Sequence, residues 1–491
     1  MRKSGILMPI FSLPSKYGIG TLGADAYKFI DFLKTAGQSY WQILPLNPTN
    51  YGDSPYQSFS SYAGNPYFVD IQTLIEEGLL TQAEAEAFDF GDNPERVDYG
   101  KLYENRLKLL KLAFSRFEVS DDYISFCNEN AFWLDDYSLF MAIKNIHNDA
   151  CWNEWEKEYK HKNEEKIACA RIELTEIIKF YKFVQYKFSK QWQKLKSYAN
   201  KNGIQIIGDI PIYVAYDSVD VWSEPQQFKL DDDLNPKVIA GCPPDAFSDD
   251  GQLWGNPIYD WEYMKKDNYG WWKNRLSYAF KLYDVVRIDH FRGFEAYYTI
   301  PFGDETAQNG EWENGPGMDF FNSIKAKLGN ELPIIAEDLG YLTPEVLKLL
   351  KETGFPGMKV LQFAFDSEEE SNYLPHNHIK NCVVYTGTHD NDTIVGWLEN
   401  SPEDDVKFAK DYLGVKSDSD FGWAMIRAAL MSVADTCILM MPDLIGLGSE
   451  GRINSPSTLG ENWQWRIKGE CINDWLAGII KENTQLYKRL P

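Results

Sequence analysis

Three segments of the chain pass from an apolar, β-rich stretch directly into a carboxylate. In order they are residues 285–293 (VVRIDHFRG), 333–340 (PIIAEDLG) and 383–392 (VVYTGTHDND). A buried strand of a parallel sheet is a nearly continuous apolar run, and in a (β/α)8 barrel the active site lies where such strands end. We therefore expect Asp289, Glu337 and Asp390 to converge on one site.

The residue types at two of these positions suit cleavage of a glycosidic bond, in which one carboxyl group acts as nucleophile and another as acid/base. Arg287 lies two positions before Asp289 and so faces the same side of a strand, where it can hold the carboxylate ionised. Glu337 follows apolar residues that would raise its pKa, as an acid catalyst requires.

Each acid taken alone also has a structural interpretation. Arg287 and Asp289 could form a structural ion pair, Glu337 could cap a helix or lie on the surface, and Asp390 could cap a turn. The acids are separated by 48 and 53 residues, which leaves room for one or two βα units between them. Three acids at independent strand ends favour the catalytic interpretation.

Apolar runs of strand length alternate along the chain with longer helical patterns, which indicates an α/β fold. Residues 38–46 give the first clear strand, and a helix is predicted before it over residues 26–37. Residues 204–214 predict another strand, with Asp209 near its end, and residues 435–448 a last one. With the strand-end acids, this pattern predicts a (β/α)8 TIM barrel.

Two stretches interrupt the pattern and predict inserted subdomains. Residues from about 73 to 201 are charged, aromatic-rich and helical in period, whereas residues from about 215 to 271 are rich in Pro, Gly, Asp and Trp with little periodicity. We expect a largely helical insertion and a loop-rich insertion near the active site. Because no linker or internal repeat divides the chain, residues 1–491 are predicted to form a single catalytic domain.

Composition restricts the partners and the compartment. The 491 residues carry a net charge of -24, which argues against nucleic acid or an anionic membrane as a partner. We find neither a signal peptide nor an apolar run long enough to cross a membrane. Seven unpatterned cysteines suit reduced thiols. We therefore expect a cytoplasmic protein, and the sequence leaves its protein partners open.

Aromatic residues in polar loops indicate carbohydrate binding, because sugar rings stack on aromatic planes while their hydroxyls form hydrogen bonds. Trp254 and Tyr56 are the better ligand candidates, whereas aromatic residues at helical spacing, such as Phe180, are expected in the core. The chain shows neither a calcium loop nor zinc-type His spacing, so we expect no metal ion and no cofactor. His376 and His378 are expected in a solvated turn.

Longer motifs resemble those of the amylomaltases, the 4-α-glucanotransferases related to α-amylases. The motifs are YGDSPYQSFSSYAGNPY, GDIPIYV, CPPDAFSDDGQLWGNPIYDW, VRIDHFRG, AEDLG, LQFAF, THDND and GENWQW, and they span nearly the whole chain. The resemblance implies a (β/α)8 barrel with inserted subdomains. It also implies a retaining double displacement that moves α-1,4-glucan segments from a maltooligosaccharide donor to glucose or another glucan.

By motif position, the resemblance gives each candidate residue a role. Asp289 matches the nucleophile, Glu337 the acid/base, and Asp390 the third carboxylate, which steadies the transition state. The positions that match substrate-binding residues are Arg287 and His389 at the reacting sugar, Asp209 at the third strand, Tyr51, Ser54 and Tyr56 in an outer glucan patch, Trp254 and Phe363 in aromatic subsites, and Asn454 in a less similar loop.

Two other functions stay open from the residues alone. A hydrolase of the α-amylase type would use the same carboxylates with water as acceptor, and the motif resemblance is what disfavours it. A non-catalytic glucan-binding protein would keep the aromatic residues, but it would need neither a nucleophile nor a proton donor.

Overall fold

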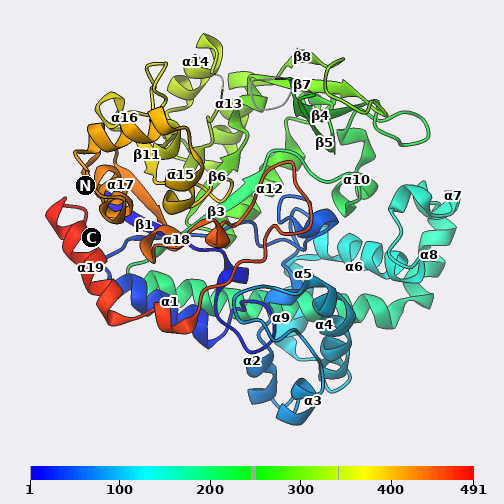
Figure 1. Cartoon of the computed structure of the whole chain (residues 1–491). Helices are drawn as coiled ribbons and strands as arrows, with labels where there is room; N and C mark the ends of the chain where they lie inside the picture. Colours follow the sequence, from blue (N-terminus) through cyan, green and yellow to red (C-terminus); the bar gives the residue numbers. More distant parts are fainter. Residues whose placement is uncertain (1, 245–249, 341) are drawn as a thin grey trace.

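The computed structural model describes residues 2–244, 250–340 and 342–491, and for Tyr51 it describes the backbone alone. Its centre is an eight-stranded parallel sheet in the order β10-β11-β12-β1-β2-β3-β6-β9 (Figure 1). The strands are β1 (Lys3–Leu7), β2 (Tyr40–Gln42), β3 (Gln205–Pro211), β6 (Val285–Asp289), β9 (Ile334–Ala336), β10 (Gly357–Val360), β11 (Cys382–Tyr385) and β12 (Thr436–Met440). Spatial order follows chain order, as in a (β/α)8 barrel.

The sheet closes where its two end strands meet, because the Ala336 N–H of β9 donates to the Pro356 carbonyl just before β10 at 3.0 Å. The register then aligns the polar residues at the carboxyl ends. Asp209 of β3 pairs with Arg287 of β6, and Pro211 pairs with Asp289. The (β/α)8 prediction is confirmed, and the strand-end residues of β3 and β6 share one end of the barrel.

The chain also contains a strand that its sequence did not reveal. We expected the first strand at residues 38–46, but β1 comes earlier, and β2 covers only Tyr40–Gln42. β1 lies between β12 and β2, so its partners are distant along the chain. The Arg489 guanidinium donates to the Lys3 carbonyl at 3.0 Å, which holds the C-terminal segment beside this first strand (Figure 1).

Helices on the outside of the barrel connect most of the strands, and the last two of them follow the final strand, β12. They are α1 (Ala24–Thr35), α12 (Gly270–Leu282), α13 (Gly317–Leu328), α14 (Pro344–Thr353), α15 (Ile394–Asn400), α16 (Glu403–Leu413), α17 (Asp418–Met431), α18 (Met441–Leu444) and α19 (Asp474–Leu486). The predicted helix at residues 26–37 corresponds to α1. Gly37, just past its end, takes φ 67°, which glycine adopts more readily than other residues.

Between β2 and β3 the chain forms a group of helices that extends to one side of the barrel (Figure 1). They are α2 (Ile71–Glu76), α3 (Gln82–Glu86), α4 (Tyr99–Phe114), α5 (Asp121–Glu129), α6 (Ala131–Ile146), α7 (Lys157–Lys160), α8 (Glu164–Glu173) and α9 (Thr175–Lys201). Phe180 and Phe183 of α9 are buried, as their helical spacing predicts. α9 also contacts α1 and β3, so this long helix belongs both to the group and to the wall of the barrel.

A second, antiparallel sheet lies above the barrel in the order β5-β4-β7-β8 (Figure 1). Its strands are β4 (Val238–Cys242), β5 (Gln252–Pro257), β7 (Ala296–Pro301) and β8 (Glu311–Asn314), and α10 (Val219–Ser223) and α11 (Trp261–Lys266) flank β4 and β5 in sequence. Residues 215–271 thus hold more regular structure than their composition suggests. β4 pairs with β7, which follows β6 in the chain. The sequence around β4 therefore could not indicate its pairing partner.

The prediction that His376 and His378 lie in a solvated turn is wrong for His378. His376 is exposed, but His378 is buried, where its ring nitrogens contact the Ser432 hydroxyl at 2.7 Å and the Tyr373 carbonyl at 2.8 Å. Burial lowers the pKa of His378. This histidine therefore links the segment after β10 to the segment before β12.

Candidate active site

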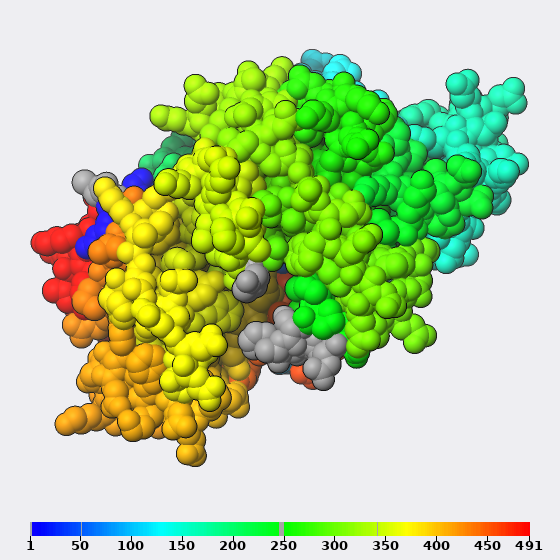
Figure 2. Space-filling view, turned by 90° about the horizontal axis from the view of Figure 1, so that it is seen from above, coloured from blue at the N-terminus to red at the C-terminus, as the bar shows by residue number. Residues whose placement is uncertain are grey.

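A cavity of about 1530 Å³ opens at the carboxyl ends of the barrel strands. Asp289, Glu337 and Asp390 all line it, so the structure brings the three predicted acids together. Figure 2 shows the surface hollowed between the yellow-coloured and green-coloured parts of the chain. Asp289 ends β6, Glu337 directly follows β9, and Asp390 lies in the loop after β11, so the barrel geometry aims all three positions into one space.

The β3–β6 wall of the cavity is organised by Arg287. Its Nη1 donates to both carboxylate oxygens of Asp209, at 2.9 and 2.7 Å, and lies 3.0 Å from Oδ1 of Asp289. Asp209 has no exposed surface and does not line the cavity. The structure therefore places Asp209 on the side of Arg287 away from the cavity, where it holds the guanidinium. Asp289 lies on the cavity side.

The environment of Asp289 differs from what the Arg287 pairing suggested. Burial raises the pKa of Asp289 to about 6 although Arg287 lowers it, and the negative charges of Asp209 and Asp390 add to the rise. Arg287 shares its charge between two carboxylates, so it offsets only part of the cost of burial. Asp289 is still largely ionised at neutral pH.

Glu337 follows β9 directly, and two backbone amides hold its carboxylate. The His290 N–H donates to Oε2 at 2.7 Å, and the Leu339 N–H donates to Oε1 at 2.8 Å. Burial, followed by repulsion from Asp289, raises the pKa of Glu337 to about 7. The rise agrees with the apolar flanks of this residue in the sequence. A carboxyl group with this pKa can both give and take a proton near neutrality.

Asp390 lies in the loop after β11, and its pKa moves the opposite way. Burial alone would raise the pKa, but attraction to His389 together with hydrogen bonds from His389 and Asn454 lowers it to about 2. His389 Nε2 lies 3.3 Å from Oδ2, and the Asn454 amide donates to Oδ1 at 2.6 Å. Asp390 is therefore a permanent anion on this side of the cavity.

Aromatic rings join the two sides of the site. Tyr56 stacks on the His389 imidazole with ring centroids 5.1 Å apart, and its hydroxyl donates to Asp209 Oδ2 at 2.7 Å. Trp463 lies 5.9 Å from both rings. Tyr56 thus lies inside the cavity, although its motif suggested an outer patch. It connects the β3 carboxylate to the β11 loop.

Trp254 of β5 and Phe363 line the same cavity. The Trp254 ring meets the His290 ring edge to face at 4.8 Å, and the Trp254 indole N–H donates to Gln252 at 3.0 Å. Phe363 is 44% exposed and packs against Tyr373. Both aromatic side chains are available to a ligand in the cavity.

The predicted patch at residues 51–56 is described in part. The side chain of Tyr51 lies outside the described residues. Ser54 lines the cavity, and its hydroxyl accepts the Tyr56 N–H at 3.2 Å.

Sequence reasoning missed two further residues of the site. Arg452 donates to the Asp390 carbonyl at 2.9 Å, and both Arg452 and Trp463 line the cavity. The signal for Trp463 was present, because it is an aromatic residue in the polar motif GENWQW. Nothing in the sequence around Arg452 indicated that it contacts the β11 loop, since that contact depends on how a distant loop folds back.

Within the described residues, no group of three or more His, Cys, Asp and Glu side chains could hold a metal ion, and no helix is long and apolar enough to cross a membrane. The site combines two neighbouring carboxyl groups with raised pKa values, a third that stays ionised, and aromatic walls. It lies at the end of a (β/α)8 barrel. These features are typical of one class of protein, the enzymes that process glycosidic bonds by acid/base and nucleophilic catalysis.

Comparison with known proteins narrows this class. A sequence profile of the family described as 4-alpha-glucanotransferase matches residues 8–472. A 4-alpha-glucanotransferase of Clostridium butyricum is 52% identical over 98% of this chain and 100% of its own length. That of Thermus thermophilus is 45% identical over 95% of each chain. The chain therefore belongs to the 4-α-glucanotransferase family.

Solved structures agree with this membership. An amylomaltase from Streptococcus agalactiae, solved in complex with acarbose, superposes with a TM-score of 0.97 at 44% identity over the whole of both chains. An amylomaltase from Corynebacterium glutamicum is 18% identical over 100% of this chain and 74% of its own, with a TM-score of 0.78, and so supports the fold alone. The expected amylomaltase relationship and the expected barrel are both confirmed.

Proposed function

We propose that this enzyme transfers segments of α-1,4-glucan from a donor maltooligosaccharide to the 4-hydroxyl of glucose or of another α-1,4-glucan. The reaction is a retaining double displacement. Asp289 is the nucleophile, because it is largely ionised at neutral pH and borders the cavity. Glu337 is the acid/base, because its pKa of about 7 lets it hold a proton and then release it.

In the first displacement, Glu337 protonates the glycosidic oxygen while Asp289 attacks the anomeric carbon. The bond to the leaving glucan breaks, and a covalent glycosyl-enzyme of inverted configuration forms. The departing segment carries away the proton from Glu337. Loss of that proton leaves Glu337 ready to act as base.

In the second displacement, Glu337 takes a proton from the acceptor hydroxyl, whose oxygen attacks the anomeric carbon and releases Asp289. A second inversion restores the α-linkage. The acceptor decides between transfer and hydrolysis. Trp254 and the segment around it limit the access of water to the intermediate, and the contact of Trp254 with His290, next to the nucleophile, supports this role.

The remaining residues hold the sugar and the acids. Asp390, a permanent anion, steadies the positive charge that develops on the distorted sugar, and His389 and Asn454 hold it there. Arg287 binds at the reacting sugar and orients Asp289. Asp209 acts through Arg287 and Tyr56, since it is fully buried.

Further residues of the cavity wall bind the glucan chain in this proposal. We propose that Ser54, Tyr56 and Phe363 contact the glucan because they line the cavity. Tyr51 remains a proposal from its motif alone.

One observation carries the proposal: Asp289, Glu337 and Asp390 line a single cavity at the carboxyl ends of the barrel strands, where the pKa of the first two is raised and that of Asp390 is lowered. The test is incubation with maltotriose alone, with products resolved by chain length and new reducing ends assayed. We expect glucose and a ladder of longer maltooligosaccharides, with reducing ends constant. Rising reducing ends with only shorter products would make water the acceptor and the enzyme a hydrolase. Unchanged maltotriose would point to a binding protein.

We also propose that the whole chain forms one catalytic domain, in which residues of about 73–201 and 215–271 are insertions into the barrel. Their positions between β2 and β3 and between β3 and β6 support this division. We propose a cytoplasmic location, which fits the seven unpatterned cysteines because they suit reduced thiols. Neither nucleic acid nor a membrane is proposed as a partner.

A further inference from the structure

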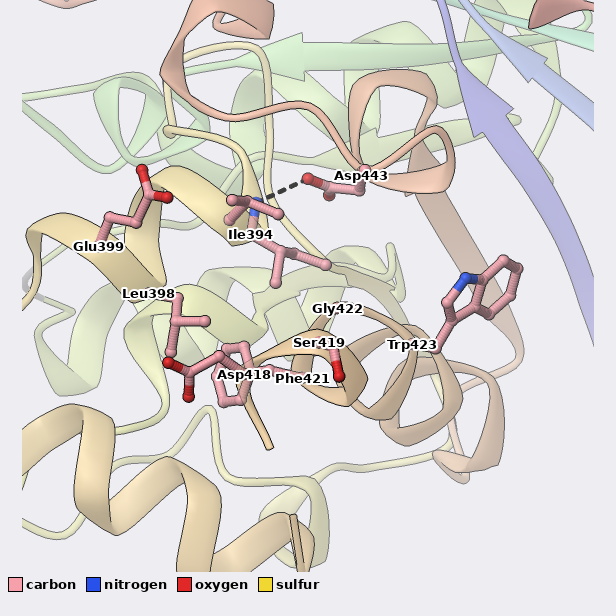
Figure 3. A pocket seen from close by; sticks show the side chains of 11 residues that line it. Ile394, Leu398, Glu399, Asp418, Ser419, Phe421, Gly422, Trp423 and Asp443 are labelled. Atoms are coloured by element: carbon pink, nitrogen blue, oxygen red, sulfur yellow. Dashed lines mark hydrogen bonds between the residues drawn. The ribbon is translucent and has the colours of Figure 1, made fainter. Parts of the chain in front are cut away.

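A buried carboxylate outside the cavity contacts the loop that carries His389 and Asp390. Asp443 lies in α18, directly after β12, and is 5% exposed. Its Oδ2 accepts the Thr386 hydroxyl at 2.7 Å, and its Oδ1 accepts the Ile394 N–H at 2.8 Å. Figure 3 shows the carboxylate pointing at Ile394. One side chain therefore makes hydrogen bonds with two separate parts of the chain.

These two parts are the ends of the same loop. Thr386 follows β11, whose last residue is Tyr385, and Ile394 is the first residue of α15. The residues between them include His389 and Asp390. Asp443 thus joins both ends of the loop to β12, a strand that neighbours β11 in the barrel.

We propose that Asp443 is a positioning residue that holds His389 and Asp390 in place by fastening both ends of their loop. Asp443 does not line the active-site cavity. It borders a separate cavity of about 440 Å³, between α15, α17 and α18 (Figure 3). Its effect on turnover rests on the proposed function of Asp390, whereas its effect on loop position does not.

The chemistry of the contact favours a side chain with two acceptor oxygens, because both loop groups donate. Burial raises the pKa of Asp443 to about 7 despite the two hydrogen bonds. An Asn at this position has nearly the same shape, and its oxygen can accept the Ile394 N–H while its amide donates to the Thr386 oxygen. A Leu fills similar volume but makes neither bond. The two substitutions therefore separate hydrogen bonding from packing.

The experiment compares Asp443→Leu and Asp443→Asn on maltotriose, with the folded fraction of each checked by circular dichroism. We expect kcat to fall about 10- to 100-fold in Asp443→Leu, since small displacements of catalytic groups have costs of this size. Asp443→Asn should recover most of the activity. Glu399→Gln and Asp418→Asn are matched controls, since these acids border the same small cavity without bonding the loop, and they should stay within about twofold of the original kcat.

A second readout follows the loop without using activity. Attraction to Asp390 raises the pKa of His389 although burial opposes it. A proton NMR titration, with His389 assigned by its loss in His389→Gln, should show this pKa falling in Asp443→Leu, because the attraction of Asp390 weakens while burial continues to lower it. Thr386→Val removes one of the two bonds and should give a smaller fall, so the test survives if Asp443→Leu does not fold.

The outcomes separate the two proposals. A folded Asp443→Leu protein with unchanged kcat and unchanged His389 titration would overturn the positioning role. An altered His389 titration with unchanged kcat would support the positioning role and refute the catalytic role of Asp390. The positioning role of Asp443 would also be overturned if Asp443→Asn lost as much kcat as Asp443→Leu. Hydrogen bonding by residue 443 would then not be the cause of the loss of kcat.

Discussion

The two walls of the cavity treat the same kind of side chain in opposite ways. The β6–β9 wall carries Asp289 and Glu337, and the β11 wall carries His389 and Asp390. On the β6–β9 wall, burial raises the pKa of both acids. Arg287 offsets only part of this rise because it is shared with Asp209, and repulsion from Asp289 raises the pKa of Glu337 further. On the β11 wall, His389 and Asn454 more than offset burial and lower the pKa of Asp390. Local sequence is similar in the two walls, with an acid after an apolar strand. The difference comes from partners that the fold supplies.

This contrast assigns separate tasks to the walls. The β6–β9 wall keeps two acids close to their transition between protonated and ionised forms, which suits bond-making and proton transfer. The β11 wall keeps one acid ionised, which suits stabilisation of positive charge. The substitutions predicted below change one wall at a time, except that of Trp254, which changes neither.

The largest effect should come from removing the nucleophile. We expect Asp289→Ala to lower kcat by roughly 10⁴-fold or more, because no covalent intermediate can form. The measurement is maltotriose turnover by product chromatography. Asp338→Asn is a suitable control, because Asp338 adjoins Glu337 in sequence but faces the Met358 N–H. Substantial turnover by folded Asp289→Ala protein would contradict the assignment.

The pH dependence tests the order of the two raised pKa values. The nucleophile must be ionised, so kcat/KM should rise as pH increases through about 6, and the acid must be protonated, so it should fall as pH increases through about 7. The two protons belong to a coupled pair, and the measured values are those of the pair.

Glu337→Gln sharpens this pH test. The variant should lose about 10²- to 10⁴-fold in rate and also lose the alkaline limb of the profile, because the group that titrates there is gone. An alkaline limb that persists unchanged in Glu337→Gln would assign that limb to another residue.

On the β11 wall, Asn454→Ala should have a smaller effect. It removes one hydrogen bond to a charged carboxylate, a contact worth about 1.5–3 kcal/mol, so we expect kcat to fall by roughly 10- to 150-fold. The acid limb of the pH profile should stay in place, since Asp289 keeps its own partners. A shift of that limb as large as the loss of rate would show that the walls are not independent.

The smallest effect should come from Trp254→Ala, which changes neither wall. We expect a few-fold rise in the ratio of hydrolysis to transfer, because water reaches the glycosyl-enzyme more easily. New reducing ends measured against longer products give this ratio. Phe363→Ala is a useful comparison, because Phe363 also borders the cavity but is not in contact with His290 in the way Trp254 is. An unchanged ratio in Trp254→Ala would remove the water-exclusion role.

Several parts of this site could be read from the sequence. Asp289, Glu337 and Asp390 were found because each follows an apolar strand, and parallel strands of a barrel bring such ends together. Arg287 and Asp289 were paired correctly because residues two apart face the same side of a strand. The raised pKa of Glu337 followed from its apolar flanks. These inferences needed only local periodicity and the strand-end rule.

Other parts required the tertiary structure. β1 was missed because its partners are β2 and β12, the latter more than 400 residues away, and β4 because it pairs with a strand beyond β6. Tyr56 was expected on an outer patch, but the fold carries it to Asp209 and His389. Side chains meet across such distances only after the barrel closes, so no local pattern records them.

The sequence by itself determined the α/β class, the acids, and, through its motifs, the family. Only the tertiary structure decided how each acid behaves. Arg287 divides its charge between two carboxylates, Asn454 and His389 gather on a third, and Asp443 holds the loop of that third acid from behind. The physical reason is that a pKa depends on the few ångströms around a carboxyl group, and those neighbours come from strands and loops far apart along the chain.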